Sequence, residues 1–105
     1  MADVREILIT GGAGQIGLEL QAVRWPANIR IHAPSRDKLD LTDPVHIARC
    51  FAVHRYAAVI NPAAYTAVDK AEREVSTAFA VNAYGPALLA QATREAGIPL
   101  IQVST

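Results

Sequence analysis

The chain has 105 residues, of which 51% are hydrophobic, and its ten Lys and Arg side chains balance ten Asp and Glu. This composition predicts one soluble globular domain and excludes a disordered or fibrous protein, and a net charge of zero argues against nucleic acid as a partner. A single cysteine, Cys50, excludes a disulfide scaffold and a zinc fold. No stretch reaches the ~18 apolar residues of a membrane span, so we expect a cytoplasmic protein with no membrane partner.

The first third of the chain predicts a strand, a helix and a second strand. Residues 4–9 form an aliphatic run that ends in glycines, which is typical of a buried strand. Apolar residues at helical spacing then predict a helix over residues 14–24, which Pro26 ends. These apolar residues are Ile16, Leu20 and Val23. Residues 29–33 predict the second strand.

A second helix is predicted to begin after Asp43. The carboxylate of Asp43 can accept from free backbone N–H groups, and Pro44 at the first helical position loses no hydrogen bond. Ile47 and Phe51 form the apolar stripe of this helix, and residues 57–60 predict the third strand.

The remainder of the chain predicts further helical structure and a fourth strand. Asn61-Pro62 ends the third strand, and Thr66 with Asp69 resembles a helix capping box. A helix over residues 81–96 ends at Gly97 and precedes a strand at residues 100–103. Its predicted buried residues are Leu88, Leu89 and Ala92.

This alternation predicts an α/β fold, a doubly wound parallel sheet of the Rossmann type that is incomplete after its fourth strand. The expected strand order is 3-2-1-4. In such a sheet ligands bind at the carboxyl ends of the strands, at a switch point expected here between strands 1 and 4. The loops expected to converge there are residues 10–17, 34–36, 61–66 and 104–105.

The sequence TGGAGQIG at residues 10–17 predicts a site for the pyrophosphate of a dinucleotide. It follows a strand and opens a helix, and a side chain at Gly11 or Gly14 would hold the backbone away from the phosphates. Gly17 is expected to let the helix pack close to the sheet, while the N–H groups at the helix start attract an anion.

The end of the second strand bears on the choice of cofactor. Ser35 and Arg36 suit the 2′-phosphate of NADPH, although Asp37 beside them leaves NADH open. Asp40 and Leu41 are expected to border the adenine, with the carboxylate accepting from its amino group and Leu41 as an apolar wall.

Several segments together resemble the N-terminal part of the dTDP-4-dehydrorhamnose reductases, a branch of the extended short-chain dehydrogenase/reductases. The segments are TGGAGQIGLEL, INPAAYTAVDKAE, AFAVNAYGPALLAQA and IPLIQVST. The resemblance implies an oxidoreductase that uses NAD(P)H to reduce the 4-keto group of a dTDP-linked deoxysugar, a step toward dTDP-L-rhamnose and surface polysaccharide.

The resemblance also implies roles for individual residues. The pyrophosphate contacts are Gly11, Gly14, Gln15 and Ile16. The residues bordering the cofactor ribose and nicotinamide are Ala63, Ala64 and Tyr65. Asn82 matches an asparagine on the helix before strand 4, and Ser104-Thr105 matches a pair in which Thr105 bonds the substrate's carbonyl oxygen.

Two further matches concern metal and the loop after strand 3. Glu19 matches a glutamate that joins a metal-linked dimer contact in some members, which implies Mg²⁺ and a homo-oligomer in the full-length context; otherwise Glu19 is a solvated helix carboxylate. Pro62 replaces an apolar residue of the family, which leaves the role of Asn61 open.

The proton donor of a short-chain reductase is a Tyr with a Lys four residues later on the same helix face. Tyr56, Tyr65 and Tyr84 all lack that Lys. We therefore expect residues 1–105 to be the NAD(P)-binding half of a reductase, without its substrate-binding part and inactive alone. The alternatives are a non-catalytic NAD(P)-binding module, a fragment that self-associates through its sheet edge, and another sugar-nucleotide reductase or epimerase.

Overall fold

The computed structural model describes residues 3–62 and 85–103. Its elements, in chain order, are β1 (Arg5–Ile9), α1 (Gln15–Ala22), β2 (Ile29–His32), α2 (Pro44–Val53), β3 (Tyr56–Asn61), α5 (Gly85–Ala96) and β4 (Leu100–Gln102). The four expected strands are confirmed. The expected capping box at Thr66 and the helix start at residue 81 lie outside the described residues.

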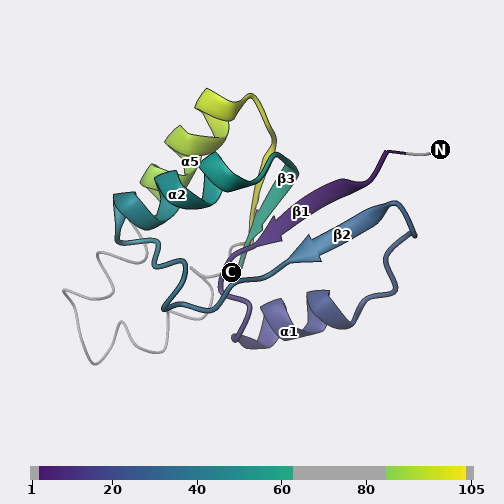
Figure 1. Ribbon diagram of the computed structural model, residues 1–105. Coiled ribbons are helices and arrows are strands. Elements are labelled where there is room, and N and C mark those ends of the chain that lie inside the picture. Colours follow the sequence, from purple (N-terminus) through teal and green to yellow (C-terminus); the bar gives the residue numbers. More distant parts are fainter. Residues whose placement is uncertain (1–2, 63–84, 104–105) are drawn as a thin grey trace.

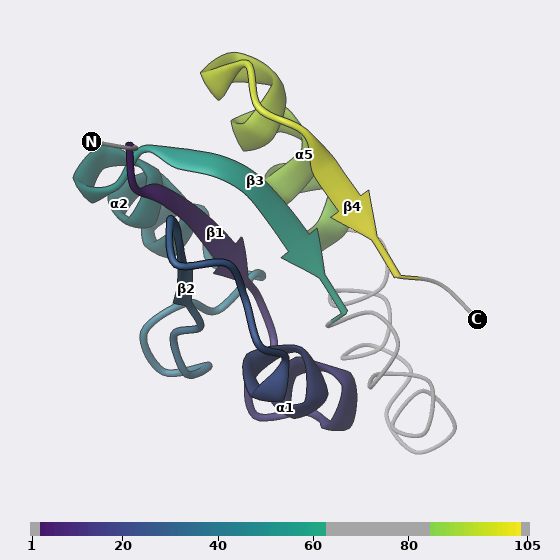
Figure 2. The same ribbon diagram turned by 90° about the vertical axis from the view of Figure 1, so that its right-hand side faces the viewer.

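All four strands are parallel, and they lie in the order β2-β1-β3-β4 (Figure 2). Ile7 of β1 aligns with Ile31 of β2 on one side and with Ala58 of β3 on the other. Val59 of β3 in turn aligns with Leu100 of β4. The parallel doubly wound sheet is confirmed, but the predicted order 3-2-1-4 is wrong.

The burial of the strands explains the observed order. β3 holds Tyr56, Val59 and Asn61 buried, so it needs a neighbour on both sides. β2 has no fully buried residue and exposes Arg30, which suits a strand at the edge of the sheet. The connection through α2 therefore crosses β1 and places β3 on its free side, so the switch point lies between β1 and β3 rather than strands 1 and 4.

Helices cover both faces of the sheet. α1 lies on one face, while α2 and α5 lie side by side on the other (Figure 1). The main core fills the space between the sheet and the α2–α5 pair. Its buried members are Leu8, Leu39, Leu41, Ile47, Tyr56, Val59 and Leu89. Each fully buried leucine or valine contributes about 1.5–3 kcal/mol relative to an exposed one.

Local hydrogen bonds set the ends of α2 and α5. The Asp43 carboxylate accepts from the Val45 backbone N–H at 2.9 Å, and Pro44 is the first residue of α2, as predicted. Gly97 adopts φ +71° after α5, and the N–H of Ile98 donates to the carbonyl of Thr93 at 3.0 Å. This is a Schellman motif, and the predicted helix end at Gly97 is confirmed.

α1 is shorter than predicted. It ends at Ala22, and Val23, expected in the buried stripe, is the C-cap and is 50% exposed. The indole N–H of Trp25 donates to the Leu20 carbonyl at 2.9 Å, and the Val23 N–H donates to the same carbonyl. Both bonds satisfy the Leu20 carbonyl, one of the acceptors that the end of the helix leaves open. Within residues 3–62 and 85–103, no helix is long and apolar enough to cross a membrane.

Candidate functional site

The loop after β1 brings free backbone donors to the carboxyl end of the sheet. Gly11 adopts φ +61°, a conformation that side chains disfavour, and its carbonyl accepts from the Gly14 N–H at 3.0 Å. Gly14 is extended and is the N-cap of α1, with no side-chain hydrogen bond to the helix start. The N–H groups of the first turn have no acceptor within the helix, so they and the positive end of the helix dipole can bind an anion.

Gly17 allows α1 to sit directly on this loop. A Cβ atom at Gly17 would lie 2.4 Å from the Gly11 carbonyl oxygen and 2.9 Å from the Gly12 Cα. The contact expected between Gly17 and the sheet is therefore made with the backbone of the glycine loop instead. Two predicted pyrophosphate contacts, Gln15 and Ile16, are the first two residues of α1. Gln15 is exposed and Ile16 is partly buried.

A polar row, buried at Thr10 and Asn61 and exposed at Gln102, links the ends of three strands beside the loop. The Thr10 hydroxyl donates to the Asn61 side-chain carbonyl, and the Asn61 amide donates to Gln102 Oε1 at 2.6 Å. Backbone bonds run alongside, since the Thr10 N–H donates to the Ile60 carbonyl and the Val103 N–H to the Asn61 carbonyl. Thr10 and Asn61 are 1% and 0% exposed. The row holds the start of the glycine loop in register with the strand that leads to residue 105.

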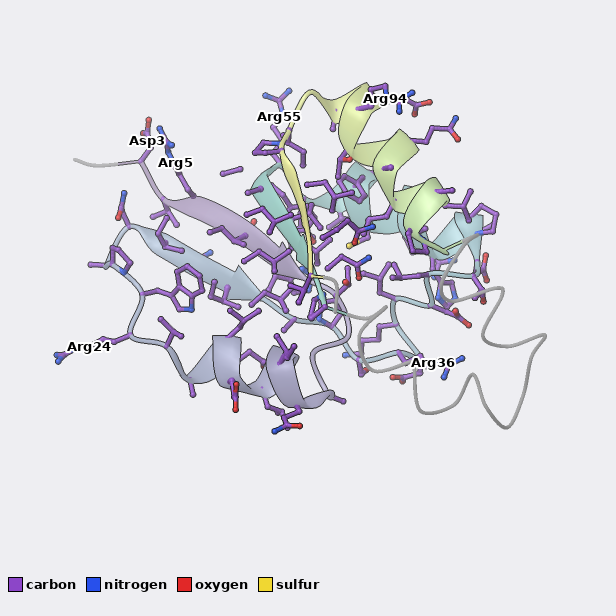
Figure 3. All side chains as sticks on the ribbon, turned by 180° about the vertical axis from the view of Figure 1, so that it is seen from behind. Asp3, Arg5, Arg24, Arg36, Arg55 and Arg94 are labelled. Carbon is purple, nitrogen blue, oxygen red and sulfur yellow. The ribbon has the colours of Figure 1, made fainter. Side chains whose placement is uncertain are left out.

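The end of β2 lies against the glycine loop. A Cβ atom at Gly12 would lie 3.0 Å from the Cβ of Ala33, so the two backbones are in close contact. Beyond it, Ser35 donates its hydroxyl to the Asp37 carboxylate, which lowers the pKa of Asp37. Arg36 is exposed and lies at the same end of the molecule as the glycine loop (Figure 3). The structure thus brings residues 11–17 and 33–36 together.

Asp40 and Leu41 differ in how much they could offer a ligand. The Asp40 carboxylate accepts from the Thr42 hydroxyl at 2.7 Å and from its N–H at 2.9 Å, and the hydroxyl bond does most to lower the pKa of Asp40. The Asp40 N–H donates to His46 Nδ1 at 3.0 Å. Leu41 is only 8% exposed and packs in the main core. Their contact with adenine stays a prediction.

The other predicted site residues lie outside the described part of the chain. They are Ala63, Ala64, Tyr65, Asn82, Ser104 and Thr105. Glu19 is exposed on α1. Over residues 3–62 and 85–103, no group of three or more His, Cys, Asp or Glu side chains could hold a metal ion.

A second polar cluster, which the sequence did not predict, lies between the sheet and the end of α2. The Tyr56 hydroxyl lies 2.6 Å from His32 Nδ1 and 3.2 Å from Cys50 Sγ. The His32 and His54 rings lie 4.6 Å apart, and His54 Nδ1 is 3.3 Å from Glu6 Oε2. The five residues come from β1, β2, α2, β3 and the α2–β3 connection, so only the folded chain assembles them.

Burial controls ionisation in this cluster. Desolvation raises the pKa values of Cys50 and Tyr56, so both stay protonated near neutral pH. Desolvation and the neighbouring His54 lower the pKa of His32. A protonated thiol is a poor nucleophile, so the burial of Cys50 disfavours a nucleophilic role for it.

Comparisons with known proteins show which sequences and solved structures this chain resembles. A family model described as the RmlD substrate binding domain matches residues 5–105. A dTDP-4-dehydrorhamnose reductase of Streptomyces griseus is 45% identical over 98 residues, which cover 93% of this chain and 32% of that protein. A probable dTDP-4,6-dihydroxy-2-methyloxan-3-one 4-ketoreductase of Streptomyces antibioticus is 42% identical over 87 residues, covering 83% and 30%.

A solved structure adds a likeness in three dimensions. The crystal structure of a dTDP-4-dehydrorhamnose reductase from Bacillus anthracis in complex with NADP superposes with a TM-score of 0.85 at 33% identity. It covers 95% of this chain and 36% of the reductase. The chain thus spans about a third of the length of the proteins it matches.

Proposed function

Because this chain belongs to the family described as the RmlD substrate binding domain, we propose that it is the cofactor-binding part of an NAD(P)H-dependent reductase. The proposed substrate of the whole reductase is dTDP-4-dehydrorhamnose. Reduction of its 4-keto group gives dTDP-L-rhamnose. The proposed partners are the dinucleotide and, in the whole enzyme, the dTDP-sugar.

The glycine loop carries this proposal. Its left-handed Gly11, its uncapped helix start and the close packing of Gly17 suit a pyrophosphate that is bound by backbone N–H groups. The complex of the similar Bacillus anthracis reductase with NADP supports a nicotinamide dinucleotide as the ligand.

We prefer NADPH over NADH as the cofactor. Arg36 lies at the carboxyl end of the sheet, where a guanidinium can pair with a 2′-phosphate. The Ser35 hydroxyl donates a hydrogen bond to the Asp37 carboxylate, so one oxygen of this carboxylate already has a partner within the loop. The described side chains give no support to the metal that the resemblance implies at Glu19.

The mechanism assigns separate tasks to the residues. A nicotinamide dinucleotide held by the glycine loop would supply the hydride for the keto carbon. Thr105 donates a hydrogen bond to the keto oxygen and polarises the carbonyl, and the network through Thr10, Asn61 and Gln102 holds the strand that leads to it. No tyrosine of this chain has a lysine four residues later, so the proton donor must come from another part of the reductase.

Another 4-keto sugar nucleotide is the second candidate substrate. The relative from Streptomyces antibioticus is a probable 4-ketoreductase of a different dTDP-sugar and is 42% identical to this chain. A shared cofactor-binding part is compatible with either substrate, since this chain covers about a third of the length of both relatives.

Calorimetric titration of the 105-residue chain with NADPH, and separately with NADH, tests the proposal. We expect micromolar binding of NADPH and weaker binding of NADH. Absence of binding by either dinucleotide would contradict the cofactor site. A second assay follows NADPH oxidation with dTDP-4-dehydrorhamnose, and turnover by this chain alone would contradict the need for an outside proton donor.

A further inference from the structure

Gln21 connects the body of α1 to the glycine loop. Its side-chain Nε2 donates to the Gly12 carbonyl at 2.8 Å and to the Gly17 carbonyl at 3.0 Å. An amide NH₂ has two hydrogens to donate, so both are used by these two acceptors. The bond to Gly17, four residues earlier on the same helix, holds the amide where it can reach Gly12.

Gly12 lies between the end of β2 and the side chain of Gln21. A Cβ atom at Gly12 would lie 3.0 Å from the Ala33 side chain, 3.2 Å from the Ala33 carbonyl oxygen and 3.3 Å from Gln21 Nε2, so no side chain larger than hydrogen fits there without displacing a neighbour. Rotating the Gly12 carbonyl away would break its bond to Gln21.

The direction of this carbonyl sets the direction of the next N–H. The peptide bond between Gly12 and Ala13 is trans, so the carbonyl of Gly12 and the N–H of Ala13 point in opposite directions. With the carbonyl bound to Gln21, the N–H of Ala13 points away from the side chain that holds it. Ala13 itself is an exposed residue.

We propose that Gln21 is a positioning residue that keeps the glycine loop in the conformation that binds the pyrophosphate. This inference rests on the proposed dinucleotide site. Gln21 acts through the Gly12 peptide and does not touch the cofactor. Preorganisation of the loop removes an ordering cost that binding would otherwise incur, so loss of the clamp weakens affinity for ligands that contain a pyrophosphate.

Two substitutions at Gln21 remove its donors. Gln21→Met keeps an unbranched side chain of similar length, and Gln21→Glu keeps the shape but places an acceptor against two carbonyl oxygens. Gln91→Met is the matched control, because Gln91 is exposed on α5 and bonds only the nearby Glu95 side chain among the described residues. The Kd for NADPH is measured by calorimetry for each, and thermal unfolding is recorded in parallel.

A ligand without a pyrophosphate separates positioning from general destabilisation. We expect Gln21→Met to weaken NADPH binding about tenfold, the equivalent of one or two hydrogen bonds, and Gln21→Glu to weaken it further. Binding of adenosine 2′-monophosphate should stay within twofold in both variants, and Gln91→Met should bind both ligands like the parent chain.

Three outcomes would overturn the inference. Unchanged NADPH affinity in Gln21→Met, with the parent chain binding normally, would refute the clamp and leave the proposed function intact. Equal losses for both ligands would show that Gln21 only supports the fold. Failure of the parent chain to bind NADPH would overturn the proposed function, and the clamp with it.

Discussion

Thr10 donates its hydroxyl hydrogen to the side-chain carbonyl of Asn61, a residue 51 positions later in the chain. Both residues are buried at the carboxyl ends of adjacent parallel strands, on either side of the switch point. Since Asn61 also donates to Gln102, one asparagine bridges the strand before the glycine loop and the strand before the predicted Thr105. The carboxyl ends of β1, β3 and β4 are thus connected by side-chain hydrogen bonds as well as by the backbone hydrogen bonds of the sheet.

Replacing the Thr10 hydroxyl with a methyl group tests this bridge. Thr10→Val has nearly the same shape but cannot donate, so the Asn61 carbonyl loses this donor in a buried site. We expect the free energy of unfolding to fall by about 1–3 kcal/mol in urea titrations. Thr10→Ser keeps the hydroxyl and should lose less. A Thr10→Val chain as stable as the parent would show that the bond contributes nothing.

Two Gly→Ala substitutions separate loop packing from backbone conformation. A methyl group at Gly17 would meet the Gly11 carbonyl at 2.4 Å, so Gly17→Ala should displace the loop, cost about 1–3 kcal/mol of stability and weaken NADPH binding. Gly97 has φ +71° and open space around it, so Gly97→Ala should cost about 1–2 kcal/mol from backbone strain alone.

Calorimetry and urea unfolding of both variants distinguish the two effects. The expected pattern is lowered stability in both, with NADPH affinity reduced only in Gly17→Ala. Equal NADPH affinity in the two variants would mean that the loop tolerates displacement and that its tight packing is unrelated to binding.

Arg36 should decide between NADPH and NADH. Gln at this position keeps a polar side chain but removes the charge that would pair with the 2′-phosphate. We expect Arg36→Gln to weaken NADPH binding roughly tenfold, because charge-assisted hydrogen bonds contribute ~1.5–3 kcal/mol, and to leave NADH binding unchanged. Arg24→Gln is the control, since Arg24 lies at the opposite end of the molecule (Figure 3). Parallel losses for NADPH and NADH would argue against a 2′-phosphate contact.

Local sequence patterns predicted the elements well because their causes are local. Asp43 with Pro44 marked the start of α2, and Gly97 marked the end of α5, since caps depend on residues within one turn. Val23 was wrongly predicted to belong to the buried face of the first helix, because apolar residues at helical spacing continue beyond Ala22, where α1 ends. The end of α1 coincides with the hydrogen bond from Trp25 to the Leu20 carbonyl. A side-chain to backbone bond of that kind leaves no periodic signal in the sequence.

The strand order could not be read from the same patterns. All four strands are short segments with aliphatic residues, and their order depends on which of them have a neighbour on both sides. Arg30 in β2 was the available signal for an edge strand, and Asn61 before Pro62 was the signal for a special strand end. The partners of Gln21 lie nine and four residues away, and only the loop conformation brings the more distant one within reach.

The cluster around His32 should make stability depend on pH near neutrality. Desolvation, the His54 ring and Lys38 lower the pKa of His32 below its ordinary value of 6.5, while Glu6 acts in the opposite direction. Tyr56, 2.6 Å from His32 Nδ1, and Cys50 beside it stay protonated and uncharged in this range. As the pH falls below about 6.5, the unfolded chain binds a proton that the folded chain resists. The free energy of unfolding should therefore fall as the solution is acidified through this window.

Variants at His32 and Asp40 test which group causes the loss of stability between pH 7 and 5 and which causes the loss below about pH 3.8. His32→Asn retains a polar group near Tyr56 but cannot titrate, so urea unfolding between pH 7 and 5 should lose much of its slope. Asp40 has its pKa lowered from 3.8 by the Thr42 hydroxyl, so its contribution is present above that value and is lost as the pH falls below it. Asp40→Asn should flatten only this lower window. If His32→Asn left the slope between pH 7 and 5 unchanged, another group would be responsible, and the His32 imidazole would have no part in the response to acid.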